Sequence, residues 1–158
     1  MRIISIIATV LFLFVFVRPG SAQTPTPSPC GVPAYANSAV PTALSALTPN
    51  GPMIAYNYPF FNSLGANGQL LFRWMLAHEC AHHLNGDVVQ AMINPQGYLM
   101  ITPQVELRAD CASAAYLRSI GDLAALNFAI AYWASFGNSS TGPNYPTGLQ
   151  RAQMLQSC

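Results

Sequence analysis

The chain has 158 residues, the length of one domain, and only 7% of them are charged. Its six Arg and five acidic residues give a net charge of +1, and no Lys is present. Because the basic excess typical of nucleic-acid-binding proteins and of proteins on anionic membranes is missing, we expect neither kind of partner.

The first 22 residues have the three-part pattern of a secretory signal peptide. A positively charged start is followed by the apolar run Ile3–Val17 and by small residues that end at Ala22. This run of 15 residues is short for a bilayer-spanning helix, which needs about 20. We therefore expect cleavage after Ala22, export to the periplasm or the extracellular space, and no membrane contact of the mature protein.

Residues 23–38 are rich in Pro and Thr, which predicts an extended lead-in to a single domain at 39–158. At the start of this domain, residues 39–47 are expected to form a short helix. Residues 52–58 have β-branched and aromatic side chains between turn formers and predict a strand. This strand could pair its backbone with an extended peptide, or it could be an ordinary strand of the domain.

Four helices are predicted to follow the strand, at 68–85, 102–120, 122–136 and 147–158. The first repeats apolar residues and histidines at three- and four-residue spacing and ends at an Asn-Gly pair. The second is expected to begin with a Thr cap and a Pro at 102–103. The predicted fold class is α+β: mostly helical, with a small sheet packed against the first of these helices.

The sequence His78-Glu79-Cys80-Ala81-His82 has the HExxH pattern on that helix. Residues four apart point the same way, so both imidazoles can bind one metal ion. Glu79 lies about 100° further round the helix, where it can reach a water activated by the metal and act as general base. The chain has only three histidines, all within residues 78–83, which argues against a coincidence.

A catalytic zinc ion needs a third protein ligand and one open position. A glycine and a histidine three and six residues after His82 would indicate a metzincin, but Asn85 and Val88 stand there. Glu106 and Asp110 are better candidates, because they are four apart on the next predicted helix. We predict that Glu106 binds the zinc ion and that Asp110 accepts a hydrogen bond from a ligating imidazole.

The stretch Leu-Ala-His-Glu-Cys-Ala-His-His, followed by Glu-Leu-Arg-Ala-Asp-Cys-Ala-Ser-Ala-Ala, resembles the gluzincin-type zinc metallopeptidases. It is most similar to small secreted relatives of the Ste24/HtpX peptidase family. The resemblance implies a minimal zincin core in which His78, His82 and Glu106 bind zinc, Glu79 is the base and Asp110 orients a ligand. Tyr145 begins a Tyr-Pro-Thr segment where that family usually has His-Pro-Ser. A role of Tyr145 as hydrogen-bond donor to the reacting carbonyl is therefore weaker than the other assignments.

Four cysteines follow the signal peptide, which predicts two disulfides in an exported protein. Spacing leaves three pairings open. We favour Cys80–Cys111 together with Cys30–Cys158, because the first pair would join the two segments that share the metal. Free buried thiols are the alternative.

The prediction is an exported zinc metalloendopeptidase that uses one zinc ion and cleaves peptide or protein substrates. Two alternatives remain open. One is a peptidase-like binding protein without activity, and the other is a structural zinc module closed by Cys80, Cys111 or His83 as a fourth ligand. His83 is otherwise expected to be partly exposed, Asp87 to lie in a turn, and Arg151 to form an internal ion pair.

Overall fold

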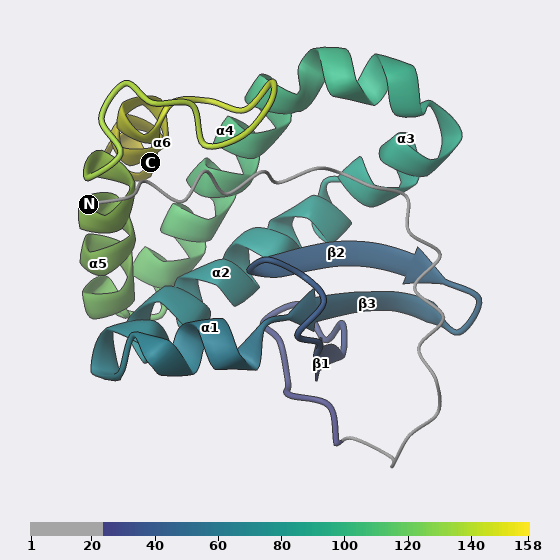
Figure 1. The fold of residues 1–158 in the computed structure, drawn as a ribbon, viewed down its shortest axis with the longest axis horizontal. Coiled ribbons are helices and arrows are strands. Elements are labelled where there is room, and N and C mark those ends of the chain that lie inside the picture. The colour runs from purple at the N-terminus through teal and green to yellow at the C-terminus, as the bar shows by residue number, and fades with distance from the viewer. Residues whose placement is uncertain (1–23) are drawn as a thin grey trace.

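The computed structural model describes residues 24–158, so the predicted signal peptide, Met1–Ala22, lies outside the described residues. The described chain is mostly helical with one small sheet, as predicted (Figure 1). Its elements in order are β1 (Ala34–Ala36), β2 (Ala43–Thr48), β3 (Gly51–Tyr56), α1 (Tyr58–Ser63), α2 (Ala66–Leu84), α3 (Asp87–Ile93), α4 (Pro95–Ser119), α5 (Leu123–Ala134) and α6 (Gly148–Ser157).

The sheet has the order β1-β3-β2, with β3 parallel to β1 and antiparallel to β2. The helix predicted at 39–47 is therefore wrong, because this segment forms β2 and pairs with β3 through a tight turn. Both edges of β3 are occupied, so this strand cannot pair with a peptide. Thr26 pairs with Ala34 at the start of β1, which holds the extended lead-in against the domain.

Helix α2 is the centre of the molecule. It packs against β2 and β3 on one side and against α4 and α5 on the other (Figure 1). Leu71 and Trp74 are fully buried, and the Trp74 indole donates a hydrogen bond to Ser113 of α4 at 3.1 Å. Because α2 carries both histidines of the predicted site, its packing places them in the interior.

Helix α4 begins at Pro95, about two turns earlier than the predicted start at 102–103. Asn94 caps it by accepting a hydrogen bond from the Gly97 amide at 3.1 Å. Pro103 lies inside the helix, where a proline removes one backbone hydrogen bond but does not end this helix. Asn94-Pro95 is thus the true capping pair, and the similar Thr102-Pro103 pair misled the prediction.

The last two helices begin as predicted. The Asp122 side chain accepts a hydrogen bond from the Ala125 amide at the start of α5. At the start of α6, Thr147 and Gln150 form a capping box. None of the helices within residues 24–158 combines the length and apolar character needed to cross a bilayer.

The two disulfides join Cys30 to Cys80 and Cys111 to Cys158, so the presence of two bridges is confirmed but the favoured pairing is wrong. The reason lies in helix geometry. Cys80 is two residues beyond His78 and points about 200° away from it, toward the lead-in and not toward α4. Cys111 follows Asp110 and turns to the C-terminal end of α6. Each bridge thus ties one end of the described chain to a helix that carries site residues.

We expect the double substitution Cys111→Ser and Cys158→Ser to lower the free energy of unfolding by about 2–4 kcal/mol, because a loop of 47 residues is no longer closed in the unfolded chain. Urea denaturation without reductant measures this loss. An unchanged midpoint would show that the bridge does not constrain the unfolded state.

Candidate metal centre

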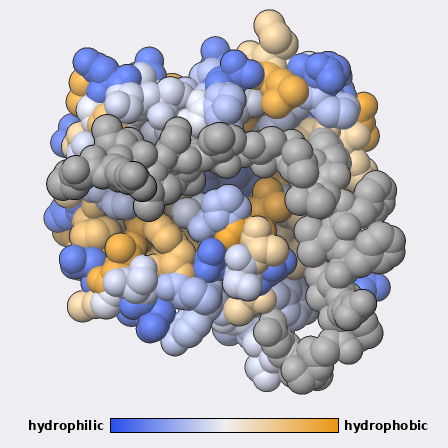
Figure 2. Space-filling model, in the orientation of Figure 1, coloured by the Kyte–Doolittle hydropathy of each residue, from blue (hydrophilic) through white to orange (hydrophobic). Residues whose placement is uncertain are grey.

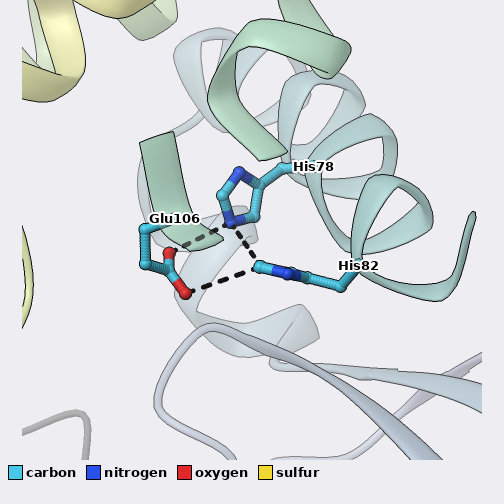
Figure 3. A group of neighbouring side chains, drawn as sticks. All are labelled: His78, His82 and Glu106. Carbon is cyan, nitrogen blue, oxygen red and sulfur yellow. Dashed lines mark hydrogen bonds and ion pairs between the residues drawn. The ribbon is translucent and has the colours of Figure 1, made fainter. Parts of the chain in front are cut away.

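Three buried side chains converge between α2 and α4 (Figure 3). The Nε2 atoms of His78 and His82 lie 3.1 Å apart. Oε2 of Glu106 lies 3.3 Å from His78 Nε2, and Oε1 lies 3.5 Å from His82 Nε2. The side chains are 3–8% exposed, so their polar atoms face one another with little access to water. These three residues, which the sequence singled out, could hold a metal ion.

Each of the two histidines has a second polar partner. Nδ1 of His78 lies 3.0 Å from Asp110 Oδ1, so Asp110 lies beside the imidazole, but the contact lacks the alignment of the predicted hydrogen bond. Nδ1 of His82 is within hydrogen-bond distance of Asp87 Oδ2, at 3.1 Å. Both carboxylates thus lie on the Nδ1 side of the rings, and the Nε2 atoms face the centre.

Asp87 was predicted to be a turn residue, and that prediction is wrong. It is the first residue of α3 and only 2% exposed, and it pairs with Arg108 of α4 as well as with His82. A signal was present: an acidic residue five positions after the second histidine is notable in a chain with only five acidic residues.

Arg151 of α6 closes the centre on the opposite side from α3. It donates two hydrogen bonds to Asp110, from Nε at 2.8 Å and from Nη2 at 2.7 Å. Nη2 also lies 3.5 Å from Glu106 Oε2. The guanidinium stacks on the Trp133 ring at 3.9 Å from its centroid. The predicted internal ion pair of Arg151 is confirmed, and its partner is a residue of the site.

The charges of this group favour a cation between the carboxylates. Burial opposes a charge on His78, but Asp110 and Glu106 outweigh this effect and raise the pKa of His78 to about 9. Burial likewise opposes a charge on Glu106, but His78, His82 and Arg151 lower the pKa of Glu106 to about 2. A positive charge is therefore favoured on His78, which lies between the Asp110 and Glu106 carboxylates.

Glu79 follows His78 on α2, and its side chain is buried, with 7% of the residue exposed. Ser45 of β2 is within hydrogen-bond distance of Glu79 Oε2, at 2.7 Å, and of the Glu79 carbonyl oxygen, at 2.8 Å. Because Ser45 lies on a segment that was predicted to be helical, this contact could not be foreseen.

The charge of Glu106 also acts on two tyrosines. Burial raises the pKa of Tyr145, and the nearby charge of Glu106 raises it further. Tyr98, near the start of α4, has its pKa raised by burial and then by Glu106 and Asp87. Both tyrosines therefore lie within range of the charge of Glu106, and Tyr98 lies outside both motifs.

The residues considered as a fourth ligand of a closed structural zinc site have other partners. Cys80 and Cys111 are in disulfides, so neither can supply a thiolate. His83 is half-buried, and its Nε2 lies 3.0 Å from the Met53 carbonyl oxygen of β3.

Comparisons with known protein families, with curated proteins and with solved structures find no match to this chain.

Proposed function

We propose that this protein is an exported zinc-dependent peptidase. The observation that carries the proposal is the spacing of the three ligand atoms. Atoms bound to zinc at about 2.0–2.1 Å in tetrahedral directions lie about 3.3 Å from one another. Here the two Nε2 atoms lie 3.1 Å apart, and each lies 3.3 or 3.5 Å from one of the two carboxylate oxygens of Glu106. Three protein ligands leave a fourth direction open, as in catalytic zinc sites.

Zinc supplies Lewis acidity, which makes water a stronger acid and polarises a peptide carbonyl. Glu79 accepts the proton that the attacking water loses and passes it to the amine that leaves when the C–N bond breaks. Ser45 holds the Glu79 carboxylate in place. Asp87 and Asp110 hold the two imidazoles, and Tyr145 donates a hydrogen bond to the carbonyl oxygen as negative charge develops there.

The motif resemblance to gluzincin-type peptidases supports the same assignment, and the two disulfides support export. A closed structural zinc site is disfavoured, because the three proposed ligands have no fourth histidine or cysteine beside them among the described residues. A binding protein without activity would keep the metal and lack turnover, so an activity measurement separates it from a peptidase.

The proposal is tested with protein purified after export. We expect one zinc ion per chain by metal mass spectrometry and cleavage of peptides from a diverse library. A chelator should remove both zinc and activity, and added zinc should restore both. Zinc binding without cleavage of any peptide would leave only the binding protein, and a protein that binds no zinc would end the proposal.

We expect Asp87→Ala to weaken zinc binding by about 10–100-fold, because His82 then loses the carboxylate that orients its ring. Competition with a chromophoric chelator measures the affinity. Gln90→Ala, on the exposed side of the same helix, is the matched control and should bind as the unsubstituted protein does. Equal affinities of the two variants would show that Asp87 does not support the ligand.

A further inference from the structure

Helix α3 leads from the end of α2 to the start of α4, at the right of Figure 1. It has only seven residues, and a helix this short is unstable in water unless contacts with the rest of the protein hold it. On the face drawn in Figure 2, hydrophobic and hydrophilic side chains are mixed over this part of the molecule. The contacts that hold α3 are therefore those of its inner side.

Apolar burial contributes little to these contacts. The large apolar side chains of α3 are 46–67% exposed: Val89, Met92 and Ile93. Val88 and Ala91 are partly buried, and Asp87 is the only residue of α3 that is fully buried. Because burial of a carboxylate is unfavourable unless the charge is paired, the attachment of α3 depends on the partners of Asp87.

The two oxygens of Asp87 contact two different helices. Oδ2 lies 3.1 Å from Nδ1 of His82 on α2. Oδ1 accepts a hydrogen bond from Nη2 of Arg108 on α4, whose side chain is 54% exposed. Within the described part of the chain, no hydrogen bond or ion pair joins Arg108 to the three proposed ligands. Arg108 can therefore be changed without removing a contact of the ligands themselves.

The contact with His82 connects α3 to the metal centre. Nε2 of His82 faces the centre, and Nδ1 faces Asp87. An imidazole that binds a metal ion through Nε2 carries its proton on Nδ1, from which it donates to Asp87. Without a metal ion the neutral ring has two tautomers, and only one of them donates to Asp87. Occupation of the centre therefore favours the form of His82 that holds α3.

We propose that a metal ion at the centre and the docking of α3, meaning its attachment through Asp87 to α2 and α4, stabilise each other. Arg108 is a positioning residue in this coupling, because it holds Asp87 within reach of His82. The coupling is reciprocal, so a change that undocks α3 weakens metal binding by the factor that metal binding contributes to docking. The proposal rests on the zinc binding proposed above and not on peptidase activity.

Hydrogen exchange of the backbone amides of residues 90–94 measures the docking of α3. We expect saturating zinc to slow this exchange at least about 5-fold relative to protein in a chelator, since couplings between sites are typically about 5–150-fold. Amides of a short surface helix exchange by local opening, so a general stabilisation of the fold by zinc does not slow them. Amides of α5 report on the fold as a whole.

Arg108→Ala tests the coupling in the other direction. We expect faster exchange of the same amides in the metal-free variant, and zinc binding weaker by about 5–50-fold in competition with a chromophoric chelator. Arg108→Lys keeps the positive charge and should recover most of both losses. Arg73→Ala is the matched control and should change neither quantity, because this arginine is 45% exposed and pairs with Asp122, which caps α5.

Equal exchange of α3 with and without zinc, in a protein that binds zinc, overturns the coupling and leaves the proposed function standing. Unchanged zinc affinity of Arg108→Ala, with faster exchange of α3, overturns it too, because docking and metal binding are then independent. Faster exchange of α5 to the same extent would show that Arg108 only stabilises the fold. A protein that binds no zinc ends both proposals, so the two failures are distinguishable.

Discussion

Glu79→Gln is expected to lower peptide hydrolysis by about 10²–10⁴-fold while the protein keeps its zinc. The amide has the shape of the carboxylate but cannot accept the proton of the attacking water, and general bases typically contribute rate factors of this size. The clustered ligand atoms belong to His78, His82 and Glu106, so zinc content should not change. Steady-state cleavage of a peptide substrate and metal mass spectrometry on the same sample measure both quantities.

Glu106→Gln is the matched control, because it makes the same chemical change in a proposed metal ligand on α4. It should lose zinc and activity together, since a neutral amide is a poor ligand for zinc. Normal turnover by Glu79→Gln would remove the proposed base. Loss of zinc from Glu79→Gln would show instead that this residue supports the metal directly.

Arg151→Ala is expected to destabilise the metal-free protein by about 3–5 kcal/mol. Asp110 has no exposed surface, and without Arg151 its charge remains buried without a full partner. The substitution also removes the guanidinium stacked on Trp133. Urea denaturation in the presence of a chelator measures the loss of stability without the contribution of bound metal.

Arg73→Ala offers a close comparison. Arg73 likewise donates two hydrogen bonds to one carboxylate, that of Asp122, from Nε at 2.6 Å and from Nη2 at 3.0 Å. The Arg73 side chain, however, is 45% exposed. Exposed pairs of this kind contribute about 0–1 kcal/mol. If the two substitutions cost the same, burial of the Asp110–Arg151 pair would not contribute to its effect.

Local patterns were sufficient for α2, α5 and α6, but they missed the short helices α1 and α3. The starts of α5 and α6 follow from Asp122 and Thr147, because capping is a contact between residues three apart. They were insufficient for β2, whose strand conformation comes from pairing with β3. They also failed at the start of α4, where two Pro-containing caps competed and packing favoured the longer helix.

The sequence by itself determined two pairs of residues at the site. Spacings of four place His78 with His82, and Glu106 with Asp110, on single helix faces whatever the rest of the chain does. Only the tertiary structure decided which helix faces meet, and this gave Cys80 its partner Cys30, brought Asp87 to His82, set Ser45 beside Glu79 and placed Arg151 against Asp110. These contacts join residues that the packing of separate elements brings together, and most of them are far apart in the chain. The helical repeat constrains side chains within a few turns, whereas partners from different elements depend on how those elements pack.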